Sequence, residues 1–214
     1  MLLTADARGV FPIAPTPFLP DGEIDRSSLD RLADFYMACG STGVTVLGQL
    51  GEAPKLDHRE SVSIASRMVK RMPVPVVVGV SAPGFAAMRA LARDVLDAGA
   101  AGVMIAPPNT LRTDDSIVAY YRQAAEAVGH DLPFVIQDYP LTFSVVMTPA
   151  VIRRIVADAI ENGHCLRAGP CAAAIARAYP GCGMSPAEIA ERIVEAAVHA
   201  RVTVEMSRPG LLSA

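Results

Sequence analysis

Five short apolar runs alternate along the chain with segments of helical period, and this alternation constrains the fold more than any other feature. The runs occupy residues 9–14, 43–47, 74–80, 102–106 and 133–136; most are rich in Val and Ile, and Gly or Pro bounds them. Such runs are typical of strands buried in a parallel sheet. The segments between and after them, residues 28–39, 58–72, 85–98, 114–128 and 149–160, have the apolar spacing of amphipathic helices. Plausible helix starts are Asp25, Asp57, Thr113 and Thr148.

A β/α unit of about 30 residues, repeated five times, predicts an α/β fold, either a (β/α)₈ TIM barrel or a doubly wound sheet. Gly40, Gly99 and Gly129 stand where three of the helices should end. No GxGxxG or GKS/GKT loop follows a strand, which disfavours a nucleotide-binding fold.

The pattern changes after about Ile160, where small residues dominate and no clear Val/Ile run follows. A helix is predicted over residues 186–199, because Ser185 suits the N-cap, Pro186 the first turn and Glu188 the third position after the cap. Residues 202–206 could form one more strand. We therefore divide the chain into a β/α barrel portion, residues 1–160, and an atypical C-terminal tail, residues 161–214. The tail is too short for three further units, which need roughly 90 residues.

Charge and composition favour a small-molecule partner. The net charge is only −3 and the charges are interspersed, so nothing indicates a nucleic-acid partner or a membrane surface. The start of the chain lacks a basic region before a long apolar run, and no apolar stretch is long enough to span a bilayer. We expect a cytoplasmic protein. The four cysteines, one of them next to His164, form no CxxC pair, so we expect neither a metal nor another cofactor.

Four segments carry a resemblance to a known family. They read GVFPIAPTPFLPDGEID, GVTVLGQLGEAPKLDHRE, VMIAPPNTLRTDDSIVAYY and VIQDYPLTFSVVMTP, and they fall within residues 8–158. Their motifs and order resemble the dihydrodipicolinate synthase/N-acetylneuraminate lyase family of class I aldolases. The resemblance implies a (β/α)₈ barrel, commonly tetrameric, that binds a 2-oxo acid such as pyruvate as a Schiff base on a lysine. We predict a TIM-barrel-like α/β fold with about five recognisable units and an incomplete or rearranged C-terminal part.

The family's GTTGE loop corresponds here to residues 48–52, where Gln49 and Leu50 replace both threonines. Such a loop lies at the carboxyl end of strand two. Gly48 and Gly51 keep the capacity to turn backbone N–H groups toward a substrate carboxylate. The same glycines could instead only shape a tight turn. All four residues are candidates for substrate binding.

The family's YNxP motif aligns with residues 137–140, and Gln137 takes the place of the tyrosine that relays protons. Because strand side chains alternate, Tyr139 could face the same side as Gln137 and partly replace that hydroxyl. Alternatively, Tyr139 packs at the strand end with its hydroxyl in water. Gln137 and Tyr139 are the catalytic candidates, while Thr142 stands where the family often has an arginine.

The family's TPYY motif corresponds to residues 106–109, where Asn109 holds the place of the second tyrosine. An amide can hydrogen-bond a substrate but cannot relay a proton near neutral pH. Asn109 is therefore either a substrate-binding residue or a turn residue. These departures disfavour the lysine-biosynthesis reaction and favour a divergent aldolase or dehydratase branch.

The family's Schiff-base lysine lies on strand six, near residues 165–167 by the unit spacing, yet the only lysines here are Lys55 and Lys70. Arg167 is the nearest cation, and a guanidinium cannot form an imine. Lys55 and Lys70 fit solvated surface positions better. The resemblance thus implies a lyase of weak or no activity. The alternatives are a non-catalytic oxo-acid-binding or oligomerisation module, or a truncated or frameshifted family member. We expect a homo-oligomer, because an incomplete barrel exposes apolar edges.

Overall fold

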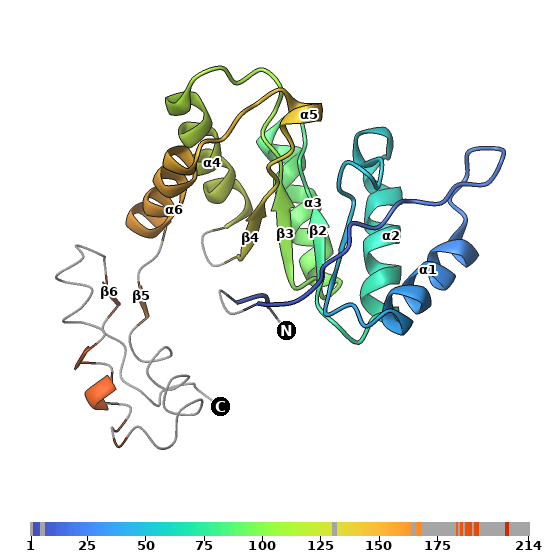
Figure 1. Ribbon diagram of the computed structural model, residues 1–214, viewed down its shortest axis with the longest axis horizontal. Coiled ribbons are helices and arrows are strands. Elements are labelled where there is room, and N and C mark those ends of the chain that lie inside the picture. The colour runs from blue at the N-terminus through green and yellow to red at the C-terminus, as the bar shows by residue number, and fades with distance from the viewer. Residues whose placement is uncertain are drawn as a thin grey trace. The chain divides into compact units, whose positions relative to one another are not determined.

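The computed structural model describes residues 2–4, 7–129, 132–163 and 166–167, together with residues 183, 185, 187–189, 191–192 and 204–205. The chain forms two compact units, Met1–Ile152 and Arg153–Ala214, and each is described by itself. Figure 1 shows the first unit as a sheet of adjacent strands with helices beside it. Helix α6 (Pro149–Gly163) contains the boundary between the units.

A four-stranded parallel sheet forms the centre of the first unit. Its strands are β1 (Val44–Val46), β2 (Val76–Gly79), β3 (Gly102–Ile105) and β4 (Phe134–Ile136), in the order β1-β2-β3-β4. Each strand pairs in parallel with the next one along the chain. A doubly wound sheet would reverse its strand order at a switch point. The observed order is that of a barrel, so it decides between the two folds that the sequence allows.

The first apolar run lies along the free side of β1 without forming a full strand. Ile13 makes an isolated parallel bridge to Thr45. The Ala14 N–H donates to the Thr45 carbonyl at 2.8 Å, and the Thr45 N–H donates to the Pro12 carbonyl at 2.9 Å. Pro12 and Pro15 lack the N–H groups that a longer ladder requires, which explains why this predicted strand is reduced to a bridge.

Three of the predicted helices begin directly after residues whose side chains cap them. The helices of the first unit are α1 (Arg26–Ala38), the short 3₁₀ helix η1 (Ala53–Lys55), α2 (His58–Arg71), α3 (Phe85–Asp97), α4 (Asp114–Val128) and the one-turn α5 (Pro140–Phe143). Asp25 accepts from the Ser28 N–H, and Asp57 and Thr113 form capping boxes. Glycines with positive φ follow α1, α3 and α4, as predicted.

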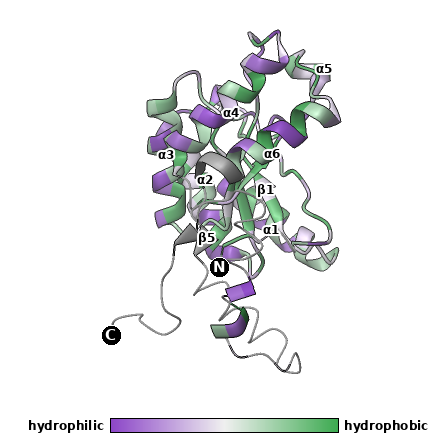
Figure 2. Ribbon diagram, turned by 90° about the vertical axis from the view of Figure 1, so that its left-hand side faces the viewer, coloured by the Kyte–Doolittle hydropathy of each residue, from purple (hydrophilic) through white to green (hydrophobic). Residues whose placement is uncertain are grey.

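Burial distinguishes β4 from the other three strands. Every residue of β1, β2 and β3 is buried, whereas β4 is only partly covered and Val135 is 37% exposed. Successive helices of the series α1 to α4 pack on one another, which is the arrangement of a barrel's outer layer. Figure 2 shows hydrophobic colouring on the strands and mixed colouring on the helices, as expected for elements that cover a core.

In the second unit, β5 (Leu166–Arg167) pairs in parallel with β6 (Val204–Glu205). Residues 187–189 and 191–192 are helical, and the Ser185 and Glu188 side chains accept from each other's backbone N–H groups at 3.3 and 2.7 Å. The other residues of the predicted 186–199 helix and 202–206 strand lie outside the described residues, as do His164 and three of the four cysteines. No helix within the described ranges is both long and apolar enough to cross a bilayer.

Candidate functional site

A pocket of about 670 Å³ opens at the carboxyl ends of β1, β3 and β4. Apolar side chains from Ile13, Met104 and Ile136 line part of it. The remaining wall comes from residues that follow β1 and β4, namely Gln49, Leu50, Gln137, Asp138, Tyr139 and Thr142. In parallel α/β folds ligands bind at the carboxyl ends of the strands. The pocket therefore lies where this architecture places its functional sites.

The pocket brings together four of the seven predicted site residues: Gln49, Leu50, Gln137 and Tyr139. Gly48 lies against its wall. A Cβ added at Gly48 would lie 3.1 Å from the Ile13 and Met104 side chains and 3.8 Å from Gln137 Nε2. Because Gly48 has no side chain, the Gln137 amide can approach the loop at this part of the pocket wall.

The loop between β1 and η1 is held in an unusual backbone conformation. Leu47 and Glu52 both have φ of 56°, a left-handed conformation that costs non-glycine residues of order 1–3 kcal/mol. Tertiary contacts fix the loop: the Thr16 hydroxyl donates to the Gly51 carbonyl at 2.7 Å, and a Cβ added at Gly79 would lie 1.9 Å from the Leu47 carbonyl oxygen. Strain held by the surrounding structure is typical of ligand-binding loops.

The same loop carries several backbone N–H groups that have no acceptor among the described residues. Within residues 7–129 and 132–163, no carbonyl or side chain accepts a hydrogen bond from the N–H groups of residues 48–51. Of these, Gly48 and Gly51 are buried, and buried N–H groups normally have a partner. Unpaired donors on successive residues are able to bind an anion.

The buried side chain of Tyr121 on α4 holds the end of β4 in position. The Gln137 N–H and the Tyr121 hydroxyl both donate to the Ile105 carbonyl, at 2.9 and 3.2 Å. The Tyr121 ring stacks on Phe134 with centroids 6.4 Å apart. Burial raises the pKa of Tyr121, and the neighbouring Tyr120 and Asp138 raise it further. Tyr121 therefore keeps its proton and acts as a donor that positions the backbone at Gln137.

Tyr139 shares the pocket wall with Gln137, but Asp138 between them lines it too and all three follow β4, so strand alternation does not account for the arrangement. Tyr139 directly precedes α5, and its carbonyl accepts from the N–H groups of Thr142 and Phe143 at 3.2 and 3.1 Å. Its side chain is 43% exposed, so the ring borders both the pocket and solvent. The arrangement leaves the hydroxyl accessible to a ligand.

Asn109 lies apart from the pocket wall. It occupies an exposed turn after β3, where its carbonyl accepts a hydrogen bond from the Arg112 guanidinium. Asp138 and Tyr121, by contrast, did not stand out in the sequence. Asp138 was only a position between two candidates, and Tyr121 was one of several apolar positions in a helical segment. Their contribution depends on contacts between α4, β3 and β4 that no local pattern encodes.

The two lysines lie elsewhere. Lys55 is 74% exposed, and its Nζ lies 2.6 Å from Glu52 Oε2. Lys70 lines a second pocket of about 460 Å³ between α1 and α2, together with Asp30, Ser63, Ser66, Arg67 and Arg71. None of the described residues that line the first pocket carries an amine or a guanidinium.

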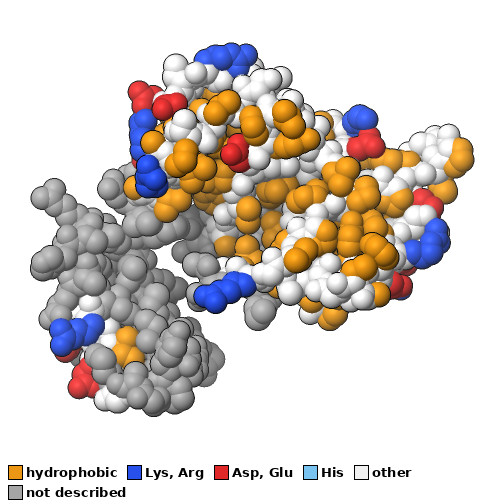
Figure 3. All heavy atoms as spheres, viewed as in Figure 1, with side chains coloured by type: hydrophobic (Ala, Val, Ile, Leu, Met, Phe, Trp, Pro, Cys, Tyr) orange, Lys and Arg blue, Asp and Glu red, His pale blue; other side chains and the backbone are white. Residues whose placement is uncertain are grey.

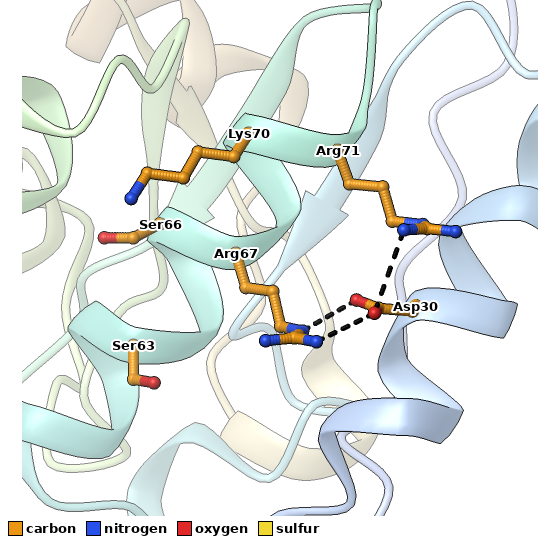
Figure 4. Close-up of a pocket in the computed structure, with 6 residues that line it drawn as sticks. All are labelled: Asp30, Ser63, Ser66, Arg67, Lys70 and Arg71. Atoms are coloured by element: carbon orange, nitrogen blue, oxygen red, sulfur yellow. Dashed lines mark hydrogen bonds and ion pairs between the residues drawn. The ribbon is translucent and has the colours of Figure 1, made fainter.

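The second pocket is shaped by ion pairs between helices (Figure 4). Arg67 donates to both oxygens of Asp30 at 2.6 and 2.8 Å, and Arg71 donates to both oxygens of Asp34 at 2.8 and 2.6 Å. The hydrogen bonds from these arginines lower the pKa of Asp30 and of Asp34. These ion pairs connect α1 to α2. Because both arginines are engaged in them, the second pocket is a weak candidate for a catalytic site.

Comparisons with known proteins agree with this geometry. The model of the Dihydrodipicolinate synthetase family matches residues 6–166. The 4-hydroxy-tetrahydrodipicolinate synthase of Methanothrix thermoacetophila is 32% identical over 149 residues, which are 69% of this chain and 50% of that protein. The chain spans about half the length of the curated relatives it matches.

Two crystal structures share the fold. The dihydrodipicolinate synthase from Rhodopseudomonas palustris is 65% identical with a TM-score of 0.72, over 74% of this chain and 53% of that one. YagE from E. coli K12, a prophage protein of the dihydrodipicolinic acid synthase family solved in complex with pyruvate, is 26% identical with a TM-score of 0.62, over 70% of this chain and 51% of that one. The first unit thus has the architecture of part of a (β/α)₈ barrel.

Proposed function

Because this chain belongs to the dihydrodipicolinate synthetase family, we propose that the pocket at the ends of β1, β3 and β4 binds a small 2-oxo acid such as pyruvate. The observation that carries the proposal is the strained loop of residues 47–52, in which the N–H groups of residues 48–51 have no acceptor among the described residues and can receive a carboxylate. YagE, which shares the fold, was solved with pyruvate bound. A loop held in position before the ligand arrives loses less entropy on binding.

The neighbouring side chains suit the other end of such a ligand. The Gln137 amide can donate to a 2-oxo group, and its backbone is fixed by the Ile105 carbonyl. The Tyr139 hydroxyl can donate or accept at the same wall. In this proposal Gln137 orients the ligand, and Tyr139 is the group able to exchange a proton with it.

We further propose that this chain forms little or no Schiff base with its ligand. Carbon–carbon cleavage by a class I aldolase needs a lysine amine whose pocket lowers its pKa. Lys55 is solvated and paired with Glu52, and Lys70 lies in the second pocket, so neither has that environment. Binding without covalent chemistry is the function that these positions support.

The test combines trapping with binding. The full chain is incubated with pyruvate and borohydride and its intact mass is measured, while isothermal titration measures pyruvate affinity. We expect pyruvate to bind without a stable adduct. An adduct that disappears in Lys55→Arg but persists in Lys70→Arg would show that Lys55 is the nucleophile and would contradict the non-covalent proposal. Absence of pyruvate binding would contradict the proposed site itself.

We also propose that the chain forms a homo-oligomer. Apolar side chains on residues that follow β1 and β4 are exposed: Leu50 by 59%, Leu141 by 85% and Val146 by 68%. Figure 3 shows hydrophobic side chains gathered over one face of the first unit. Grouped apolar side chains on a protein surface commonly mark an interface. Association would remove this apolar surface from water.

A further inference from the structure

The first pocket is not uniformly favourable for an anion. Among the described residues that line it, Asp138 is the one charged side chain, and its carboxylate has no ion-pair partner in the described part of the chain. The N–H groups of residues 48–51, which have no acceptor in the described part of the chain, provide a positive potential at the β1 side. The pocket is therefore electrostatically divided.

We propose that this pocket prefers a 2-oxo acid whose far end carries a positive charge, and that Asp138 and Tyr139 recognise that end. The inference rests on the proposed binding of a 2-oxo acid and specifies its class. The ligand's carboxylate lies at the loop of residues 48–51, its oxo group at Gln137, and its cationic end beside Asp138.

The pocket has room for such a ligand. Its volume of about 670 Å³ lies in the middle of the range that accommodates drug-sized molecules, so a three-carbon acid leaves much of it unfilled. Ile13, Met104 and Ile136 offer an apolar wall against which a short methylene chain can pack. A five-carbon acid uses this wall and still reaches the residues after β4.

Two different groups favour a cation at the β4 side. The Asp138 carboxylate attracts a positive charge and repels a second carboxylate. The neighbouring Tyr139 also lines the pocket, and an aromatic ring can attract a cation such as a quaternary ammonium. Because both side chains are partly in water, the preference is a matter of several-fold in affinity and weakens with added salt.

The experiment compares 2-oxo acids with the same five-carbon backbone that differ only at C5: 5-trimethylammonio-2-oxopentanoate, 2-oxopentanoate and 2-oxoglutarate. Isothermal titration of the full chain measures each Kd, with pyruvate as the check on the site itself. We expect the cationic ligand to bind about tenfold more tightly than 2-oxoglutarate, with the neutral ligand between them. This ratio should fall toward about twofold at high salt.

Asp138→Asn should reduce the same ratio to about twofold, because it removes the charge while keeping the shape. Asp97→Asn, an exposed position on α3 with the same change in net charge, should leave the ratio at its wild-type value. If pyruvate binds but the three ligands have equal Kd values, the inference is wrong and the proposed function stands. The same holds if the ratio of Kd values changes neither with salt nor with Asp138→Asn. If pyruvate also fails to bind, both are wrong.

Discussion

Gly79 and Leu47 show how single residues fix the candidate site. Gly79 is the last residue of β2, and the Leu47 carbonyl oxygen occupies the place where its Cβ would be. Leu47 itself has a left-handed backbone, so the carbonyl has little freedom to move. Glycine at position 79 is thus what allows the pocket loop to lie against the next strand.

Gly79→Ala should displace this loop. We expect a loss of about 1–3 kcal/mol in the free energy of unfolding, the usual cost of overpacking, and a weaker Kd for pyruvate. Urea denaturation and isothermal titration measure the two effects. Gly84→Ala is the matched control, because a Cβ at Gly84 meets no atom within 4 Å. Equal behaviour of the two variants would contradict the packing argument.

At the scale of elements, α1 and α2 are joined by paired side chains that stand 37 positions apart in the sequence. The Arg67–Asp30 and Arg71–Asp34 pairs each form two hydrogen bonds, and Arg71 also lies 3.8 Å from Asp30. Hydrogen bonds from the arginines hold the pKa of both carboxyls below the ordinary value of 3.8. The paired carboxylates link the two helices over successive turns.

This link should weaken in acid. A carboxyl whose pKa is lower in the folded protein stabilises it above its unfolded pKa, and that stability is lost as pH falls through the lowered folded value. Thermal unfolding measured from pH 6 down to pH 2.5 should show a fall in Tm below about pH 4. Asp30→Asn should reduce the size of this fall. The exposed Asp21→Asn serves as control, and an identical fall in all three proteins would contradict this assignment.

At the scale of the whole molecule, the first unit is a coherent series of parallel β/α units within a chain that spans about half the length of its curated relatives. β4 is the last strand of its sheet and is partly exposed. The apolar side chains of Leu50, Leu141 and Val146 lie on residues that follow β1 and β4. These surfaces are what the proposed oligomer would cover.

Self-association can be measured by light scattering after size exclusion. We expect a mass above the 22.5 kDa of one chain. Leu141→Asp should lower it, because Leu141 is almost fully exposed and a charge there opposes apolar contact without entering the core. Leu19→Asp, at an exposed loop position before α1, should leave the mass unchanged. A wild-type monomer at all concentrations would contradict the proposed oligomer.

Local chemistry explains what could be predicted. Asp25, Asp57 and Thr113 were identified as helix starts because capping involves side chains and N–H groups within three residues. The Val-rich runs were recognised as strands for a similar reason, since burial on both faces leaves a continuous apolar run. Within the site, strand alternation predicted that Gln137 and Tyr139 face the same side, but both lie beyond the end of β4 and Asp138 between them lines the same pocket. Their contribution to function stays a prediction.

The sequence by itself determined the identity, order and starting points of most elements of the first unit, because these depend on contacts between near neighbours in the chain. Only the tertiary structure decided that the strands follow one another in barrel order, that Asn109 stands outside the pocket, and that Asp138 lies within it. Those facts depend on residues that are far apart in sequence, and their pairing is set by packing of the whole sheet and its helices.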